Sequence, residues 1–575
     1  MPHRMLTLLA LLALLSTGAA QQFGRLLPSD SFLALGMQDI ANHEAKVRVF
    51  LDELERQGVL SALSALFPND GLESSLELEG ELPPELEGVG LLDLLGQEAW
   101  VAVSASSFSP LPSVTLLTRT APKATAAIGR LIAGAASEQQ VQALAEGDVT
   151  FYQAQLDTED FPNLVAYAQV NDVLTLSTNP DTLRGVLRRL AGSGEPNLAS
   201  SEGYASTFGR LGSGNFYLYL DYAAIAALVT PLGQGLGLDK LVSRLGTALD
   251  TAGTAASVVR ITATGFSSEG AQALNSSSND PDLLSLLSNP NPVSREALAF
   301  APATALSFAA IRTDLTGWWD YLNDLTSSTL DLEGDLLNSL IELLGIDLRS
   351  TFFDWAGSQV ATISTGAAAV VEPGVAVNNL LGETVYLIET TDPAAAQAGL
   401  DQLLAAVGEG VAAFSDPSGG AGNLSISTRD MAGVKVTRIA VIPGMTLSYA
   451  VADNFALIAT SANSIDAVLS AFASGVSLRP TLAPLLDEVP SDARSFTLAD
   501  TRATLENAAL QLTSQLQLTA GLGGASNLDF DAVMEASQAL ERYLLFVASR
   551  LGGSLSYSQV KDDIIFTFNR TEISW

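Results

Sequence analysis

The chain contains two histidines, His3 and His43, and this limits the chemistry open to it. Histidine supplies most general-base catalysis and many metal sites. His3 lies in a segment that we expect to be removed, and His43 stands beside Glu44 in an expected amphipathic helix over 39–57. A single histidine without a partnered nucleophile makes no catalytic triad. We therefore expect His43 to be a surface or boundary residue of that helix.

Ser558 and Lys561 have the Ser-x-x-Lys spacing of acyl-transfer enzymes. That motif works when both groups face each other at a helix start, whereas residues three apart on a strand point to opposite faces. The surrounding residues indicate a terminal strand, so we expect no catalytic pair. The glycine-rich run 233–237 lacks the full dinucleotide-binding spacing and is expected to be a turn between helices.

Carboxylates are abundant, with 63 Asp and Glu residues. Residues 157–160 and 279–282 offer oxygen ligands for Ca²⁺, but neither matches a dedicated calcium loop, and solvated loops are the simpler interpretation. Residues 73–87 likewise indicate a solvated acidic face. A glycosidase requires two carboxyl groups at a defined separation, which the sequence does not select. We predict no catalytic, cofactor-binding or metal-ligating residues.

Two aromatic groups are candidates for stacking on sugars or for binding proteins: Trp318, Trp319 and Tyr321, and separately Tyr217 and Tyr219. Because side chains alternate along a strand, Tyr217 and Tyr219 share one face of the segment 216–221. Aromatic side chains usually serve burial. Core packing is therefore the preferred interpretation for both groups.

Short apolar or alternating segments indicate strands over 113–120, 216–221, 447–451 and 455–460. Ala- and Leu-rich segments that open on proline indicate helices over 122–134 and 393–407. Asn171-Asp172 and Asp453-Asn454 separate apolar runs and tolerate positive φ, which predicts two tight hairpins. Asn179 and Ser461 are the expected N-caps of the helices that follow.

The sequence also repeats itself. Five segments have a partner in the same order about 260 to 280 residues later: 27–35 with 301–309, 96–104 with 357–364, 114–122 with 385–393, 167–187 with 449–469, and 215–221 with 495–500. We expect an α+β protein of two tandem homologous modules, each a largely antiparallel sheet covered by helices. The modules would occupy 21–285 and 286–575, divided in the polar stretch 275–292.

Residues 1–20 have the three parts of a secretory signal peptide: Arg4, a short apolar run over 6–15, and small residues at 17–20. The chain has no cysteine, which favours a bacterial envelope or extracellular protein that relies on core burial. Its formal net charge of −35 disfavours nucleic acid as a partner. We expect no transmembrane span in the mature chain, because no later apolar run is long enough.

Several segments resemble an uncharacterised family of exported bacterial proteins, known as domain of unknown function 3352. The segments that carry the resemblance are 27–30, 344–348, 353–357 and the hairpin and helix over 449–469. It implies no catalytic residues, because none is established for the family. In one departure, the first half has Gly90-Leu-Leu-Asp93 where the second has Gly345-Ile-Asp347.

These features favour an exported, non-enzymatic binding or scaffold protein of the periplasm, cell envelope or extracellular space. Its partner would be an envelope protein, a glycan or an apolar ligand. One alternative is a carrier that binds an apolar ligand or lipid between sheet and helices, with helices such as 91–95 and 336–344 lining the pocket. The other is a carboxylate-dependent hydrolase, which would require two facing acids, one with a raised pKa.

Overall fold

The computed structural model describes residues 23–39, 43–58, 96–105, 112–137, 141–155, 164–234, 239–329, 347–366, 383–414, 425–442, 445–475, 478–510 and 530–575. These residues divide into two compact units. Unit 1 takes the described residues of Met1–Asp52, Phe67–Asp280 and Asp563–Thr567, and unit 2 takes those of Glu53–Leu66, Pro281–Asp562 and Phe568–Trp575. The main division falls between Asp280 and Pro281.

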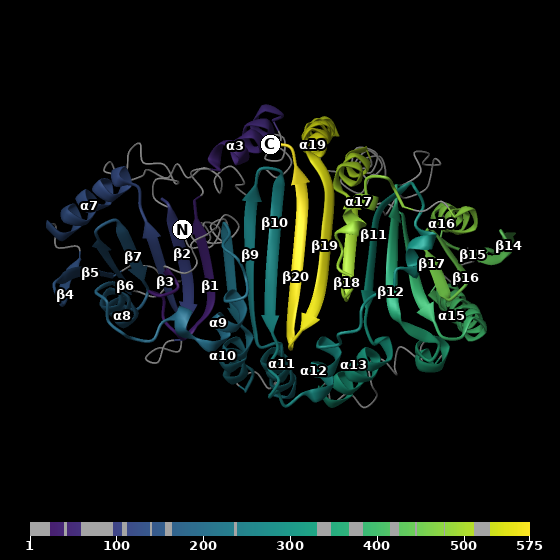
Figure 1. Ribbon diagram of the computed structural model, residues 1–575, viewed down its shortest axis with the longest axis horizontal. Helices are drawn as coiled ribbons and strands as arrows, with labels where there is room; N and C mark the ends of the chain where they lie inside the picture. The colour runs from purple at the N-terminus through teal and green to yellow at the C-terminus, as the bar shows by residue number, and fades with distance from the viewer. Residues whose placement is uncertain are drawn as a thin grey trace. The chain divides into compact units, whose positions relative to one another are not determined.

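The described strands of unit 1 follow the order β4–β5–β6–β7–β3–β2–β1–β8–β9–β10, and every neighbouring pair is antiparallel (Figure 1). Their bounds are β1 (Ser31–Gln38), β2 (Glu98–Ser104), β3 (Ser113–Arg119), β4 (Gln142–Glu146), β5 (Val149–Gln155), β6 (Leu164–Val170), β7 (Val173–Ser177), β8 (Phe216–Asp221), β9 (Thr254–Thr262) and β10 (Gly265–Ala273).

The described strands of unit 2 follow the order β14–β15–β16–β17–β13–β12–β11–β18–β19–β20. Their bounds are β11 (Ala305–Arg312), β12 (Ala356–Thr365), β13 (Glu383–Thr390), β14 (Ser425–Met431), β15 (Val434–Ile442), β16 (Met445–Ala452), β17 (Phe455–Ala459), β18 (Ser495–Asp500), β19 (Leu551–Lys561) and β20 (Ile564–Ile573). The tip of the last hairpin, Asp563–Thr567, groups with unit 1.

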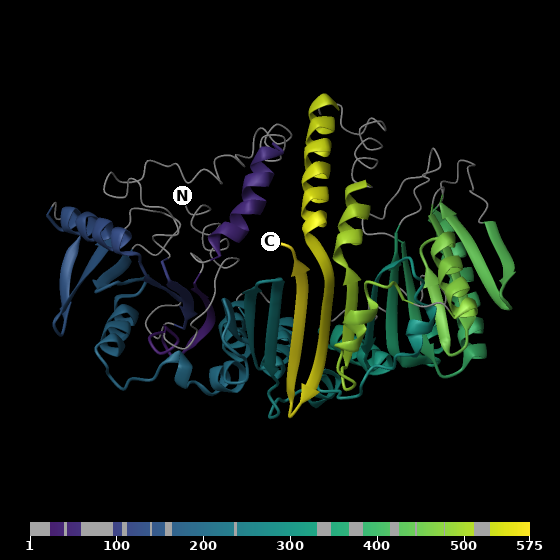
Figure 2. The same cartoon turned by 45° about the horizontal axis from the view of Figure 1, so that its top comes forward.

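Helices complete each unit. Those before Pro281 are α3 (Glu44–Arg56), α7 (Pro122–Ser137), α8 (Pro180–Leu190), η3 (Leu198–Ser200), α9 (Glu202–Phe208), α10 (Tyr222–Gln234) and α11 (Asp239–Ala252). Those after it are α12 (Pro281–Leu287), η4 (Glu296–Phe300), α13 (Leu315–Thr329), the π-helix η5 (Arg349–Phe353), α15 (Pro393–Phe414), α16 (Ala462–Ser474), α17 (Ala483–Asp487), a helix over 501–510, and α19 (Phe530–Arg550). Figure 2 shows α19 running directly into β19. The chain is thus α+β, as the sequence predicted.

In unit 2 the sheet buries apolar side chains on both faces. Leu387 and Ile388 are neighbours on β13 and point to opposite faces, because side chains alternate along a strand. Leu387 packs in a core that includes Ile465 and Val468 of α16. Ile388 packs in a separate core that includes Leu400 of α15. Helices therefore cover the two faces of this sheet.

The two hairpin turns predicted from polar pairs are confirmed. Asn171 joins β6 to β7 with φ 56°, and Asp453 joins β16 to β17 with φ 51°. Both are in the left-handed region that Asn and Asp tolerate better than other residues with a Cβ. The expected helix over 39–57 is shorter than predicted, since α3 begins at Glu44 and Asp39 has φ 68°.

Both N-caps predicted from the sequence are also confirmed. The side chain of Asn179 accepts hydrogen bonds from the first backbone amides of α8, and the side chain of Ser461 does the same for α16. These amides lack intrahelical partners, so the cap supplies bonds that the helix cannot. Gly475 ends α16 in the left-handed conformation, with φ 64°.

The strand order of unit 2 repeats that of unit 1 strand by strand, with β11 in the place of β1 and β20 in the place of β10. The pairing registers give residue-level counterparts. Gly36 of β1 pairs with Trp100 and Tyr217, and Ala310 of β11 pairs with Ala361 and Phe496. The sequence comparison aligned Phe496 with Phe216. The strand register makes Phe496 equivalent to Tyr217 instead, a shift of one residue.

Candidate functional site

His43 lies just before α3 and is half-buried. Burial, followed by the neighbouring charge of Lys46, lowers the pKa of the imidazole. The nearby Lys46 ammonium donates to the backbone carbonyl of Thr262 over 2.9 Å. His43 is therefore a boundary residue beside a structural contact.

Ser558 and Lys561 contact different partners. Both lie on β19, where the Ser558 hydroxyl bonds to the Ser495 hydroxyl of β18 over 2.6 Å. The Lys561 ammonium pairs instead with the Asp492 carboxylate at 3.4 Å, and both side chains are exposed. The strand geometry thus sends the two groups to different partners.

The acidic segment 279–282 leads into α12, whose first turn contains Asp282. Asp280 is buried, and its backbone N–H donates to the Ser278 hydroxyl over 3.1 Å. Within the described residues, no three His, Cys, Asp or Glu side chains come together as metal ligands. The segments 73–87, 91–95, 157–160 and 336–344 lie outside the described residues, as does 235–237 of the glycine-rich run.

The aromatic groups have different surroundings. Tyr217 and Tyr219 are 3% and 1% exposed, so the prediction of core packing is confirmed for them. Trp318 and Trp319 on α13 are only partly buried. Trp319 stacks on Phe353 of η5 with ring centroids 4.6 Å apart, which fixes one tryptophan within unit 2.

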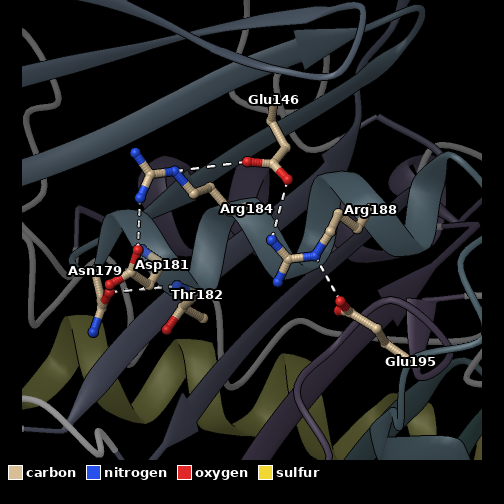
Figure 3. Close-up of polar contacts among 7 residues, drawn as sticks. All are labelled: Glu146, Asn179, Asp181, Thr182, Arg184, Arg188 and Glu195. Carbon is tan, nitrogen blue, oxygen red and sulfur yellow. Dashed lines mark hydrogen bonds and ion pairs between the residues drawn. The ribbon is translucent and has the colours of Figure 1, made fainter.

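A network of charged side chains surrounds α8 (Figure 3). Glu146, at the end of β4, accepts from Arg188 at 3.1 Å and lies 3.7 Å from Arg184. Arg188 also bonds to Glu195 at 2.6 Å, and Arg184 bonds to Asp181 at 2.7 Å. The guanidinium groups of Arg184 and Arg188 are thus both already paired with carboxylates. The network therefore ties the β4–β5 hairpin to α8 and is not prepared for an anionic ligand.

A buried polar group lies elsewhere on the same sheet, at Glu98. This residue begins β2 and is 3% exposed. Its Oε1 has no hydrogen-bond partner among the described residues, and Trp100 Nε1 lies near the carboxyl without forming a bond of normal geometry. Burial raises the pKa of Glu98 to about 7, although Arg119, the backbone N–H of Phe23 and the indole N–H of Trp100 act in the opposite direction.

Aromatic rings surround Trp100 and form what we term the aromatic cluster: Trp100, Tyr204, Phe208, Tyr217 and Tyr219. Trp100 stacks on Tyr217 with centroids 5.9 Å apart, and Phe208 lies 5.6 Å from Tyr217. Burial raises the pKa of Tyr204, and the nearby Glu98 carboxyl adds to that effect. Tyr204 thus stays neutral, as a buried phenol should.

Residues 23–28, which we term the first segment, pack over this cluster. Phe23 and Leu27 are 1% and 0% exposed, and both belong to the same apolar core as Trp100. The Arg119 guanidinium lies over the Phe23 ring at 5.7 Å and bonds to Asp172 at 2.9 Å. Three further bonds hold the backbone: Arg189 Nε to Leu26 O at 2.7 Å, Leu198 N to Leu27 O at 3.1 Å, and Ala199 N to Gly24 O at 3.0 Å.

The counterpart of Glu98 in unit 2 is Gln359, since Glu98 pairs with Gln38 and Gln359 with Arg312 at matching register positions. Gln359 is 0% exposed. Its Oε1 accepts from Ser294 N at 2.6 Å, and its Nε2 donates to Ser294 O at 2.9 Å. The amide therefore clamps the backbone that precedes β11 with both of its polar atoms. The carboxyl of Glu98 lacks a donor for the second bond unless it is protonated.

The sequence comparison contained a signal for this site that residue types alone did not provide. Aligning 96–104 with 357–364 places Glu98 on Gln359 and Trp100 on Ala361. A carboxyl on the same strand face as a tryptophan and alanines is unusual for a buried strand, because charged groups are almost never fully buried unless paired. Glu98 and Trp100 are thus the functional candidates that the search for catalytic motifs missed.

The fold and the site together define an α+β protein with extensive antiparallel sheet and one unusual buried carboxyl. Residues 128–523 match the family described as Protein of unknown function (DUF3352), and the chain belongs to this family. The match confirms the resemblance seen in the sequence.

Two solved structures, crystal forms I and III of TP0453, are 13% identical to this chain and have TM-scores of 0.22. They cover 48% and 47% of this chain, and the chain covers 88% of each. A likeness this weak carries no argument. No curated protein matches the chain.

Proposed function

We propose that this is an exported, non-enzymatic binding or scaffold protein of the cell envelope or extracellular space, built from two copies of one α+β module. The observation that supports the two copies is the strand order, which is the same in both units over their described strands. Independent origins would have to arrive at the same long, non-sequential order twice. Duplication followed by divergence requires it only once.

Equivalent contacts at equivalent positions support the duplication. Leu198 N donates to Leu27 O at 3.1 Å in unit 1, and Leu478 N donates to Ala301 O at 2.8 Å in unit 2. Leu27 and Ala301 are both fully buried, and each precedes a proline. Each contact fixes the backbone just before the first strand of its unit. Such a bond has no reason to recur unless the two segments descend from one.

A binding or scaffold role is supported by how the polar side chains are used. The groups with the best spacing for catalysis, Ser558 and Lys561, take part in separate structural contacts. Arg184 and Arg188 hold a hairpin against a helix. None of the helices in the described part of the chain is both long and apolar enough to span a membrane.

The proposal is tested on the full chain expressed in a bacterium with its leader. We expect an extracytoplasmic product whose first residue is Gln21, identified by mass spectrometry of the N-terminal peptide. Retention of residues 1–20 in the cytoplasm would contradict the export proposal. The purified product should then show no turnover in a screen of ester, peptide and glycoside substrates. Turnover that a single carboxylate substitution abolishes would refute the non-enzymatic role, and lipid retained in native mass spectrometry would favour a carrier.

A further inference from the structure

The strongest unexplained feature of unit 1 is a buried carboxyl in a position where unit 2 has an amide. Gln359 satisfies both of its polar atoms on Ser294. Glu98 accepts from the Phe23 backbone N–H, yet its Oε1 has no partner among the described residues. A buried polar atom without a partner costs free energy, and the cost is greater when the group is charged. The site is therefore suited to the neutral acid and poorly suited to the carboxylate.

We propose that Glu98 is a proton-operated latch for the first segment. With a neutral carboxyl, residues 23–28 are docked on the aromatic cluster, and with a charged carboxyl they open. This device lies beyond the proposed binding or scaffold role and does not depend on it.

The charges around Glu98 do not neutralise it when it ionises. Arg119 is its cross-strand neighbour and the cation that acts on it, but the Arg119 guanidinium is 2.9 Å from Asp172 and is already paired. From α9, Tyr204 is neutral because burial raises its pKa. The first segment contributes only the Phe23 backbone N–H. Among the described residues, no second cation is left to compensate a charge at this position.

Opening would expose the aromatic core rather than a surface loop. Phe23 and Leu27 are almost fully buried in the core that contains Trp100, Tyr204 and Tyr217. Bonds from Arg189, Leu198 and Ala199 also hold the segment. The titration of Glu98 thus makes part of the docking free energy of the first segment depend on pH.

The direction and size of the effect follow from linkage. The docked carboxyl has a pKa of about 7 against an ordinary value of 4.5, so it binds more protons when docked than when open. Docking is therefore strongest below pH 4.5, weakens as the pH rises toward 7, and is constant above it. Between pH 5 and pH 8 the open fraction should increase on the order of 50-fold.

The absence of cysteine allows a direct test, because one introduced thiol is the only one in the chain. Leu27→Cys reports on the first segment, and Ala301→Cys reports on the matching position of unit 2. Alkylation by N-ethylmaleimide is measured on the folded full chain and divided by the rate for the same variant unfolded in urea at the same pH. We expect the ratio for Leu27→Cys to rise about 50-fold from pH 5 to pH 8, and the ratio for Ala301→Cys to change little.

Two matched substitutions identify the residue responsible. Glu98→Gln should remove the rise at Leu27→Cys, because the amide does not titrate. Gln359→Glu should create a rise at Ala301→Cys. An unchanged pH profile at Leu27→Cys after Glu98→Gln would overturn the proposal.

If a cysteine variant fails to fold, hydrogen exchange decides the question on chains without cysteine. Protection of the peptide over 23–38 should fall with pH in the wild type and stay level in Glu98→Gln. Equal pH dependence in the two chains would overturn the latch. This outcome is separate from the tests of export and of turnover.

Discussion

Gly36 and Trp100 form a packing pair whose energetic coupling is expected to be large. The two residues are directly opposite on β1 and β2. A Cβ added to Gly36 would lie 2.1 Å from Cε2 of Trp100, which is far inside van der Waals contact. Trp100 is 1% exposed and stacked on Tyr217, so it has little room to move. Gly36→Ala should therefore force the ring or the strand to shift.

The magnitudes follow from the two single changes. Overpacking a dense core typically costs about 1–3 kcal/mol, and a contact this short favours the upper end. Trp100→Ala removes the ring and should cost about 3–5 kcal/mol. Once the ring is gone, Gly36→Ala meets no clash and restricts the unfolded chain, which stabilises by about 0.4–1 kcal/mol. The coupling energy between the two sites should then be at least about 2 kcal/mol.

The assay is a double-mutant cycle. Urea unfolding of the four chains is followed by far-UV circular dichroism, and hydrogen exchange in β1 and β2 assigns the loss to unit 1. The reciprocal change, Ala361→Trp in unit 2, should be destabilising beside Ala310 and should be relieved by Ala310→Gly. An equal cost for Gly36→Ala with and without the Trp100 ring would refute the reasoning.

Three further changes have defined outcomes, each measured by urea unfolding. Asn179→Ala removes the cap of α8 and should cost about 1 kcal/mol, whereas Asn179→Asp should cost little; equal losses would argue against the cap. Arg494→Met leaves the last carbonyls of α12 without the buried guanidinium that they accept from, and should cost about 2 kcal/mol; no loss would mean that water replaces it. Glu146→Gln weakens its pairs with Arg184 and Arg188, and should cost less than about 1 kcal/mol. This loss should disappear in 1 M salt, which screens ion pairs; a loss that persists in salt would show that the pairing is not electrostatic.

Local chemistry predicted much of the fold. Polar pairs at Asn171 and Asp453 predicted hairpins, since few residues with a Cβ tolerate left-handed φ. Prolines at the first turn predicted α7 and α15, which begin at Pro122 and Pro393. Such signals act over a few residues and depend little on distant contacts. These turns and helix starts could therefore be predicted from the sequence alone.

The register between paired strands was harder to predict from the sequence. The comparison of 215–221 with 495–500 aligned Phe216 with Phe496. The strand register instead makes Tyr217 the counterpart of Phe496, because Tyr217 pairs with Gly36 and Phe496 pairs with Ala310. On a strand, a shift of one residue exchanges the buried and the opposite face. Periodicity within one strand does not fix register between strands, so the sequence supported the repeat without fixing its alignment at this point.

The candidate site escaped sequence reasoning for a related reason. Glu98 is one of 63 acidic residues, and only the comparison of the two halves, together with the residues on its strand face, sets it apart from the others. Its environment is created by Trp100, by the cross-strand Arg119 and by the first segment, which lies about 70 residues earlier in the chain. A raised pKa arises from tertiary burial, which composition does not encode.

At matched positions the two cores differ in polarity and in aromatic content. On β3 and β7, Thr115, Thr175 and Ser177 are buried. The Thr115 and Ser177 hydroxyls bond to each other at 3.2 Å, whereas Thr175 Oγ1 has no hydrogen-bond partner among the described residues. Their register counterparts in unit 2 are Val385, Leu457 and Ala459, all 0% exposed. The register thus moves Val385 by one residue from Val114, its partner in the sequence comparison, to Thr115.

Trp100 also stands where unit 2 has Ala361, but at other matched positions unit 2 has the aromatic or polar residue, with Phe308 for Ala34 and Ser448 for Ala166, all 0% exposed. At positions where one unit has a buried polar residue and the other an aliphatic one, stability alone favours the aliphatic residue, since buried polar groups contribute little net free energy even when hydrogen-bonded. If both units descend from one module, the buried carboxyl of Glu98 is the difference that most needs a functional reason, and Gln359 in unit 2 supplies its control.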